Sequence, residues 1–474
     1  MQTNYDVIVI GGGASGMMAS IFSARNGNST LVLDHNEKLG KKLYITGKGK
    51  CNLTNNSPIE THLNNTITNS KFMFSALNQF SPQNTMEFFE ENGLKLRTER
   101  GNRVFPDSDK SSDVIKTLER TMQRYGVVIS LEQEIKTVKK VQNKFHILCD
   151  NKIEYTSNSL IVATGGVSYA GTGASGLGYD IAKTFGHALV EPRSALCPIV
   201  VSDNISELNG LSLRNITLSY KNGKKEFNEF GDLLFTFNSL TGPTALTMSS
   251  KINKLDIKNT KIYIDLKPAL SEEKLDEKFV REFVEFAKKD YRNYLNSLLP
   301  ASFIEFFMKK TKIKNKKMSE FTKADRTTLI KTLKHFEFTI NSLDNINVSI
   351  VTSGGVDVKQ INAKTCESKL VENLYFVGEV LDVDALTGGF NLQIAWSTGF
   401  VAGNNVHWYR YCHTEQTNSS GKHFVLLVIL SFSQVVRKRL HLFSSKSKNP
   451  INITGNKKLK GLKVYRFVNS HRYN

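Results

Sequence analysis

The sequence predicts an α/β fold in which one parallel sheet is built from two distant parts of the chain and interrupted by an insertion. Three short apolar runs, at residues 5–10, 158–163 and 374–377, each lead directly into a glycine turn. Runs of this kind are typical of parallel strands buried on both faces. Residues 194–349, between the second and third runs, differ in character and indicate a separate domain.

The N-terminal element is predicted to be a strand–turn–helix–strand unit. Residues 5–10 form the first strand, residues 11–16 a glycine turn, residues 15–26 a helix and residues 29–34 a second strand. Small and apolar residues fill the helix, which suits packing against a sheet. This unit is the opening of a Rossmann-like fold.

The glycine turn has the spacing G-x-G-x-x-G at Gly11, Gly13 and Gly16, and Asp34 ends the second strand. The first glycine permits a tight turn, the second lets the backbone approach a pyrophosphate, and the third allows close packing of helix and strand. The helix N-terminus would offer its N–H groups to the phosphates, and Asp34 would bind an adenosine ribose. In this context the motif predicts a dinucleotide site rather than a turn without a ligand.

A second match to the same motif falls at Gly171, Gly173 and Gly176. Its context is weaker, because residues 167–170 do not form a buried strand and no strand ending in an acid follows at the right distance. We therefore expect a loop leading into a helix at residues 179–185, rather than a separate nicotinamide-nucleotide fold.

The insertion divides into a β-rich part, residues 194–268, and a helical part, residues 269–345. The helical part is rich in Lys, Glu, Leu and Phe, and Phe279, Phe283 and Phe286 fall on one helix face. Apolar stripes at this spacing indicate ordinary core packing.

The net charge of +19 resembles that of a nucleic-acid-binding protein, but its distribution weakens that interpretation. Residues 405–474 contain 13 Lys and Arg and a single acid, Glu415, so most of the excess belongs to a basic tail of unassigned role. We therefore expect a small-molecule substrate and consider nucleic acid an unlikely partner. No feature of the sequence indicates an oligomeric state.

The five cysteines, Cys51, Cys149, Cys197, Cys366 and Cys412, are scattered and odd in number. This pattern argues against a metal site and a disulfide framework, and favours a reducing, cytoplasmic location. The N-terminus lacks a basic signal region, and the most apolar stretch, residues 424–432, is shorter than the roughly 20 residues of a membrane-spanning helix. We therefore expect no membrane association.

A basic segment at residues 40–55, GKKLYITGKGKCNLTN, contains four lysines and three glycines. Glycines allow close backbone approach, and lysines neutralise phosphate, so the segment suits contact with a phosphorylated cofactor. A flexible basic surface loop remains the alternative.

Together with the glycine turn, two long segments carry a resemblance to a known family: the segment at 40–55 and GEVLDVDALTGGFNLQIAWSTG at 378–399. Shorter matches lie at residues 103–106, 163–166, 172–178, 239–243 and 352–356. Over residues 4–404 the chain resembles the HI0933-like flavoproteins, which are NAD(P)/FAD-dependent oxidoreductases.

The resemblance implies a two-part FAD-binding domain, residues 1–193 and 350–404, around the inserted domain at 194–349. It implies that the segment at 40–55 lies along FAD, and that the turn at 388–393 brings backbone N–H groups to the flavin ring. The residues expected at the cofactor are Gly11, Gly13, Ala14, Ser15, Gly16, Asp34, Lys41, Lys42, Thr46, Gly47, Cys51, Asn52, Ala163, Thr164, Gly165, Gly378, Glu379, Asp382, Gly388, Gly389, Asn391, Leu392 and Gln393.

Two positions depart from the family pattern. Lys50 stands where Arg is frequent, which keeps the charge but loses the planar fork. Ala385 stands where Gly is frequent, which makes that turn less free at positive φ.

No catalytic acid or base is identified by the sequence. Cys51 lies among lysines, which would lower the pKa of its thiol, but it has no partner cysteine nearby, which favours a packed residue beside the cofactor. Asp382 and Asp384 follow the Gly378 turn and either orient the cofactor or are solvated loop acids.

We expect an enzyme that accepts hydride from NAD(P)H at FAD and reduces a small organic acceptor, such as a conjugated double bond. One alternative is an FAD-dependent oxidase of a small amine or ketone. Another is an RNA-associated flavoprotein, in which the basic tail binds phosphate.

Overall fold

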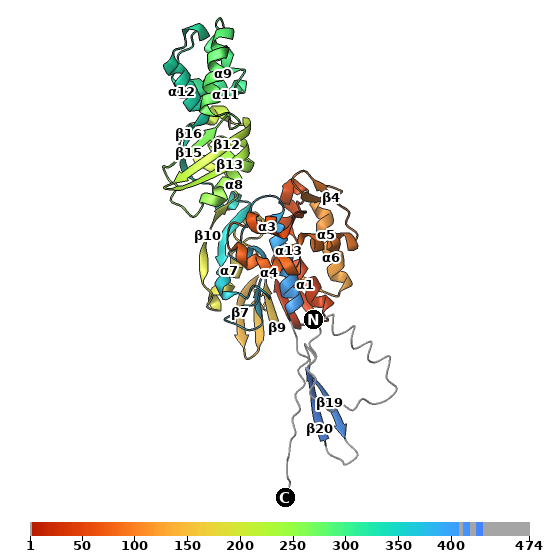
Figure 1. The fold of residues 1–474 in the computed structure, drawn as a ribbon. Helices are drawn as coiled ribbons and strands as arrows, with labels where there is room; N and C mark the ends of the chain where they lie inside the picture. The colour runs from red at the N-terminus through yellow and green to blue at the C-terminus, as the bar shows by residue number, and fades with distance from the viewer. Residues whose placement is uncertain (1, 407–410, 418–422, 430–474) are drawn as a thin grey trace.

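A computed structural model describes residues 2–406, and the backbone of a hairpin formed by β19 (Tyr411–Thr417) and β20 (His423–Ile429). Most of the predicted basic tail lies outside the described residues. The described part has two domains, one at each end of an elongated shape (Figure 1). No helix within that part is long and apolar enough to cross a bilayer.

The larger domain is built on a seven-stranded sheet in the order β6-β2-β1-β9-β8-β7, with β18 also paired to β9. Its parallel strands are β1 (Asn4–Ile10), β2 (Thr30–Leu33), β6 (Val128–Ser130), β9 (Glu154–Val162) and β18 (Leu374–Phe376). These strands pair in parallel although they come from the two ends of the described chain. The predicted fold class is confirmed.

Two helices that are far apart in the sequence pack against each other on this sheet (Figure 1). They are α1 (Ala14–Arg25) and α13 (Phe390–Asn405). A Cβ atom at Gly399 would lie 2.5 Å from the carbonyl oxygen of Ser15, and one at Gly403 would overlap that of Ala19. Glycine at these two positions therefore lets the helix backbones touch.

The remaining elements of this domain surround the sheet. The helices are α2 (Lys41–Ile45), α3 (Ile59–Asn65), α4 (Ser70–Gln79), α5 (Pro82–Glu91), α6 (Ser111–Arg124) and α7 (Leu177–Thr184). A separate small sheet contains β3 (Thr54–Asn55), β5 (Arg103–Pro106) and β4 (Leu96–Glu99). The hairpin of β7 (Ile135–Val141) and β8 (Lys144–Cys149) belongs to the seven-stranded sheet itself, because β8 pairs with β9.

The chain enters the inserted domain through β10 (Leu189–Ala195) and leaves it through β17 (Val351–Val356), and these two strands pair antiparallel. The domain contains a closed barrel of β11 (Ile199–Val201), β14 (Ser239–Thr241), β13 (Lys225–Phe235), β12 (Ser212–Asn222), β15 (Lys261–Asp265) and β16 (Phe336–Leu343). Its helices are α8 (Pro243–Ile252), α9 (Glu272–Glu285), α10 (Tyr291–Leu295), α11 (Ala301–Thr311) and α12 (Lys323–Lys334).

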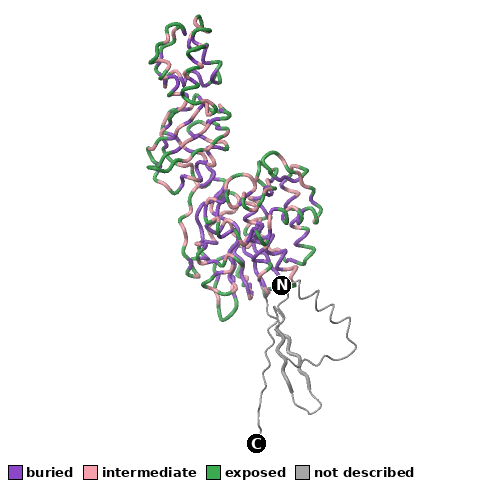
Figure 2. The backbone as a smooth tube through the Cα atoms, viewed as in Figure 1, coloured by how far each residue is buried: buried purple, intermediate pink, exposed green. Residues whose placement is uncertain are grey.

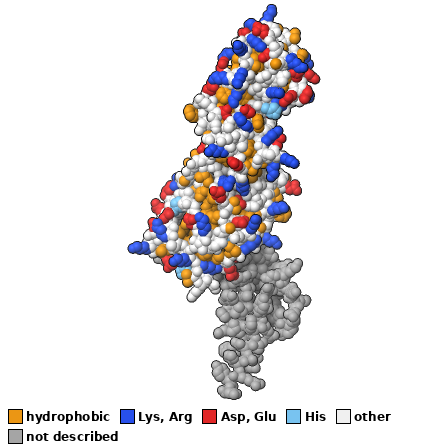
Figure 3. Space-filling view, turned by 90° about the vertical axis from the view of Figure 1, so that its left-hand side faces the viewer, with side chains coloured by type: hydrophobic (Ala, Val, Ile, Leu, Met, Phe, Trp, Pro, Cys, Tyr) orange, Lys and Arg blue, Asp and Glu red, His pale blue; other side chains and the backbone are white. Residues whose placement is uncertain are grey.

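Each domain has its own apolar core, as the buried segments in Figure 2 indicate. Phe279 and Phe283 of α9 are buried with their rings 5.7 Å apart, so this stripe packs in the core of the inserted domain. On the face shown in Figure 3, basic and acidic side chains are interspersed over both domains.

The sequence predicted that residues 269–345 are helical throughout. In the structure the end of this segment is strand β16, which closes the barrel. Phe336, Phe338 and Ile340 alternate with more exposed residues, which is the period of a strand with one buried face. The helices α9 to α12 are therefore inserted between two neighbouring barrel strands.

Candidate cofactor and active site

The glycine turn after β1 is packed too closely for side chains at two of its three motif positions. Gly11 has φ 104°, and a Cβ atom there would lie 2.5 Å from the carbonyl oxygen of Ala163. A Cβ atom at Gly16 would overlap the carbonyl oxygen of Gly11. Gly13 differs, because its Cβ position has no atom within 4 Å, so the turn faces open space there.

The N-terminus of α1 points at this open space and has no side-chain cap. Uncapped N–H groups together with the helix dipole make such a terminus a site for an anion. Asp34, at the end of β2, accepts a 2.6 Å hydrogen bond from the Gly12 N–H through Oδ2. Its other oxygen, Oδ1, accepts from the backbone and side chain of Asn36, so the carboxylate also fixes the turn to the sheet.

The second glycine-rich segment lies beside the same end of β2. A Cβ atom at Gly173 would lie 2.7 Å from Nε2 of His35 and 2.5 Å from Nδ2 of Asn36. A short 3-10 helix (Ala170–Thr172) precedes α7 here, and no strand leads into it. The segment thus packs beside the end of β2 as a loop that leads into α7, which is the predicted arrangement.

The basic segment at 40–55 forms α2 and a 3-10 helix (Thr46–Gly49). Lys42 contacts the C-terminal part of the domain, because its Nζ donates to Glu379 Oε2 at 2.7 Å and to Ser168 Oγ at 2.7 Å. Glu379 Oε1 also accepts from the Thr352 N–H at 2.8 Å. Lys41 pairs with Glu37 on the surface instead.

The two positions that depart from the family pattern are accommodated. Lys50 pairs with Asp109 at 3.1 Å. Ala385 is absent from the residues with positive φ, so it brings no backbone strain. Its N–H donates to Oδ1 of Asn391 at 2.9 Å, and Nδ2 of Asn391 returns a bond to its carbonyl oxygen at 2.7 Å.

The segment after β18 approaches the first glycine turn. Gly378 has φ 75°, and a Cβ atom there would lie 2.5 Å from Ser15 Oγ. Gly389 has φ 98° and precedes α13, whose N-terminus also lacks a side-chain cap. With its amide flipped, Asn52 would accept from the Gly389 N–H at 3.0 Å. The turn after β18 thus contacts the start of α1, and the start of α13 contacts the segment at 40–55.

The side chain of Gln393 forms hydrogen bonds to other residues of the protein. It is fully buried, and its Oε1 accepts from the hydroxyls of Thr54 at 2.6 Å and Thr85 at 2.9 Å. Its Nε2 donates to Phe80 and Ser397. Gln393 and Asn391 thus hold the start of α13 in place, and both side chains are engaged in hydrogen bonds within the protein.

The expected lowering of the Cys51 thiol pKa is wrong. Cys51 is fully buried, and burial raises its pKa to about 12. The neighbouring Lys48 and Lys50 are exposed and do not compensate for the loss of hydration. The alternative interpretation, a packed residue with no redox role, fits this geometry.

Several buried polar atoms near these loops have no hydrogen-bond partner among the described residues. They include Thr164 Oγ1, Tyr179 Oη, Asp382 Oδ1 and Asp384 Oδ2. Burial raises the pKa of both aspartates and raises that of Tyr179 well above its ordinary value. The two aspartates are therefore buried groups rather than solvated loop acids.

The aspartates lie at the seam between the two domains. Asn69 Nδ2 donates to the carbonyl oxygen of Asp382 at 2.7 Å, and Ser353 Oγ donates to Asp384 Oδ1 at 2.9 Å. Lys254, from the inserted domain, donates to Thr68 Oγ1 at 3.2 Å. The sequence did not indicate Asn69 or Lys254, because no motif surrounds them.

These features fit a dinucleotide such as FAD. Gly13 and Gly165 face open space, two helix N-termini are uncapped, and Thr164 Oγ1 has no partner. Pyrophosphate suits the first terminus, because its backbone N–H groups need an acceptor. The described residues contain no cluster of ligands for a metal ion.

The HI0933-like protein Rossmann domain matches residues 5–405 of the chain. A ribosomal RNA dihydrouridine synthase of Haemophilus influenzae is 31% identical over 84% of this chain and 98% of its own length. The Escherichia coli protein of the same name is 29% identical over 85% and 98%. A 3-dehydro-bile acid delta(4,6)-reductase of Clostridium scindens is 28% identical over 83% and 97%. These matches confirm the predicted family and the oxidoreductase class.

Proposed function

The chain belongs to the HI0933-like family, and from this premise we propose that it is an FAD-dependent reductase acting on a uracil base of ribosomal RNA. The observation that carries the proposal is the similarity to the Haemophilus influenzae dihydrouridine synthase along 98% of that protein. Dihydrouridine is uridine with its C5–C6 double bond reduced, and that bond is conjugated to a carbonyl group. The proposal therefore keeps the expected reaction and changes the expected substrate.

The chain's own residues would hold FAD in the following way. The N-terminus of α1, at Gly13, would take the pyrophosphate, and Asp34 would take the adenosine ribose. The start of α13, at Gly389, would offer its positive end to the flavin ring. The chemistry that bound FAD would supply is acceptance of a hydride from NAD(P)H and its delivery to one carbon of the double bond, while the other carbon takes a proton from water.

One ion pair and one pair of hydrogen bonds would hold the backbone of this site in position. Lys42 and Glu379 join the segment at 40–55 to the turn after β18. Asn391 closes the turn before α13 through Ala385. Because an ordered backbone positions the N–H groups that donate to the phosphates and the flavin ring, these side chains would support cofactor binding without touching the substrate.

The test is to reduce the purified holoprotein with NADPH under anaerobic conditions and add ribosomal RNA that lacks the modification. The expected result is a bleached flavin spectrum that recovers with RNA, and a nucleoside heavier by two hydrogen atoms in the digested RNA. Reoxidation by RNA without that nucleoside, or the absence of any flavin spectrum, would contradict the proposal. NADH in place of NADPH identifies the preferred reductant.

A second candidate is a reductase of a small conjugated enone. The similarity to the bile acid reductase, along 97% of that protein, supports it and agrees with the small-molecule substrate expected from the sequence. Recovery of the bleached flavin with a steroid enone, and none with RNA, would favour this candidate over the first.

A further inference from the structure

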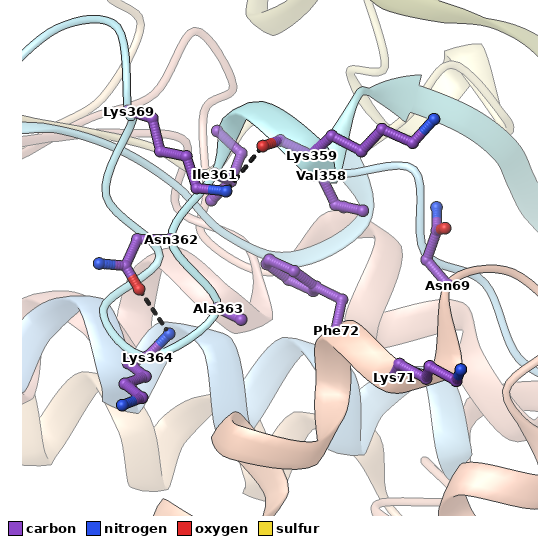
Figure 4. A pocket seen from close by; sticks show the side chains of 10 residues that line it. All are labelled: Asn69, Lys71, Phe72, Val358, Lys359, Ile361, Asn362, Ala363, Lys364 and Lys369. Carbon is purple, nitrogen blue, oxygen red and sulfur yellow. Dashed lines mark hydrogen bonds between the residues drawn. The ribbon is translucent and has the colours of Figure 1, made fainter.

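A lysine-rich pocket of about 390 Å³ lies on the FAD-binding domain, beside the start of α4 (Figure 4). Its other wall is the loop after β17, which begins with a 3-10 helix (Val358–Gln360). Four of the ten lining residues are lysines: Lys71, Lys359, Lys364 and Lys369. This is a different place from the glycine turns, and neither the sequence motifs nor the proposed chemistry uses it.

The positive charge of the pocket is not neutralised by its surroundings. None of its lining residues is acidic. Among the described residues, none of the four lysines forms an ion pair, in contrast to Lys41, Lys42 and Lys50 of the segment at 40–55. Lys369 only donates to the carbonyl oxygen of Lys359, at 2.8 Å. Like charges gathered in one hollow attract an anion with several charges.

The floor of the pocket is apolar. Phe72, Val358, Ile361 and Ala363 lie between the lysines, and the ring of Phe72 extends into the middle of the view in Figure 4. At the rim, Asn69 offers its Oδ1 as an acceptor, because its Nδ2 is bonded to Asp382. Asn362 offers its Nδ2 as a donor, because its Oδ1 accepts from the Lys364 N–H. An apolar floor under a basic rim suits a nucleotide, whose base or ribose packs below while its phosphate contacts lysines.

The pocket adjoins the candidate active site through both of its walls. Asn69, at the start of α4, donates from Nδ2 to the carbonyl oxygen of Asp382 at 2.7 Å and to its Oδ2 at 2.9 Å. On the other wall, the Asp382 N–H donates to the carbonyl oxygen of Val356 at 3.0 Å, two residues before Val358. A ligand here would lie directly beside the loop that joins Glu379 to the start of α13.

We propose that this pocket binds a backbone phosphate and the adjoining nucleoside of an RNA strand, next to the base that is reduced. The proposal rests on the proposed function and adds the surface that holds the strand. Phosphate contacts fix the position of a strand without reading its sequence, which is the property needed beside a reaction site.

The test compares binding of a fluorescein-labelled single-stranded oligouridylate to the FAD-loaded protein and to the double variant Lys71→Gln with Lys364→Gln. The control is Lys312→Gln with Lys314→Gln, which removes two exposed, unpaired lysines from the inserted domain. Binding is measured by fluorescence anisotropy at several salt concentrations, and FAD content confirms that each variant is folded.

We expect the pocket variant to bind RNA about tenfold more weakly, and the control variant to bind within about twofold of the parent protein. Each phosphate contact to a single strand contributes about 0.7 to the slope of log affinity against log salt, so losing two lowers that slope by about 1.4. Equal losses in the two variants, or no loss in the pocket variant, would overturn the inference.

Two further outcomes separate this inference from the proposed function. If the parent protein reduces uracil in RNA but the pocket variant binds RNA normally, the proposed function stands and the pocket inference falls. If the pocket variant binds RNA normally but NADPH reduces its flavin more slowly, the pocket holds the nicotinamide nucleotide. The inference is again overturned in that case. A parent protein that binds no RNA contradicts both.

Discussion

Lys42 and Glu379 form a 2.7 Å ion pair although 337 residues separate them in the sequence. Lys42 follows the first glycine turn, and Glu379 follows the last strand of the sheet, β18. Ser168 contacts both side chains, at 2.7 Å and 3.1 Å. The pair thus joins the two parts of the FAD-binding domain at the point where the inserted domain interrupts it.

This pair is expected to stabilise the domain by more than a surface ion pair does. Its side chains are 29% and 22% exposed, so solvent screens it only in part. A double-mutant cycle of Lys42→Met and Glu379→Gln, followed by urea unfolding, should give a coupling free energy of about 1 kcal/mol. The matched cycle on Lys41 and Glu37, with Glu37 54% exposed, should give about 0.3 kcal/mol. Equal couplings would contradict the role assigned to Lys42.

Two glycines of the first motif should respond differently to alanine. A Cβ atom at Gly16 would overlap the Gly11 carbonyl oxygen, so Gly16→Ala should destabilise even the FAD-free protein, by about 1–3 kcal/mol. Gly13 has φ −81° and open space around it, so Gly13→Ala should leave the FAD-free protein as stable as the parent. Its methyl group would instead stand where the pyrophosphate approaches, and FAD affinity should fall at least about tenfold.

The measurements are thermal unfolding of the FAD-free variants and fluorescence titration with FAD. A Gly13→Ala variant that binds FAD with unchanged affinity would place the pyrophosphate elsewhere. A Gly16→Ala variant as stable as the parent protein would show that the turn can move to admit the methyl group.

Strands β1, β9 and β18 of the parallel sheet could be predicted because each is an apolar run that leads into a glycine turn. Strand β6 was not predicted, because it is only three residues long and no glycine turn follows it. The hairpin of β7 and β8 lacks that signal, since lysines alternate with its apolar residues and only one face is buried. Strand β16 was hidden for a different reason: it follows α12 directly, and its apolar residues extend the helical pattern by chance.

The glycine turns of the site are local in sequence and were therefore visible in it. The contacts at the seam between the two domains were not visible in the sequence. Lys254 reaches Thr68, and Asn69 reaches Asp382, only because of the way the inserted domain and α4 pack against the sheet. Lone lysines and asparagines carry no spacing from which such contacts could be inferred. The burial that raises the pKa of the Cys51 thiol is equally a property of the fold.

The cysteines of the folded protein should be unreactive. Cys51, Cys149, Cys197 and Cys366 are all buried, and burial raises the pKa of Cys51 and Cys366 to about 12. Thiolate is the reactive form, so little is available near neutral pH. In a Cys412→Ser variant, Ellman's reagent at pH 8 should label no thiol rapidly, and all four after denaturation. Rapid labelling that maps to Cys51 would restore a redox role for it.

Asp384 should make the stability of the protein depend on pH. Its side chain is fully buried, and burial raises its pKa above the unfolded value, against smaller opposing effects of Thr68, Ser353 and Lys254. A group whose pKa is raised by folding stabilises the folded state fully below its unfolded pKa, about 4, and loses that contribution as pH rises through the folded pKa. Ionised Asp384 therefore costs stability at neutral pH.

Asp384→Asn removes this charge and keeps an oxygen for the Ser353 hydroxyl. The variant should be more stable than the parent at pH 7.5, by about 1.4 kcal/mol for each unit by which the pKa is raised, and nearly equal to it at pH 4. Urea unfolding at both pH values measures the difference, and Asp107→Asn, at an exposed position, serves as the control. A parent protein that is more stable than Asp384→Asn at pH 7.5 would show that the ionised carboxylate has a favourable partner, such as Lys254 at the seam.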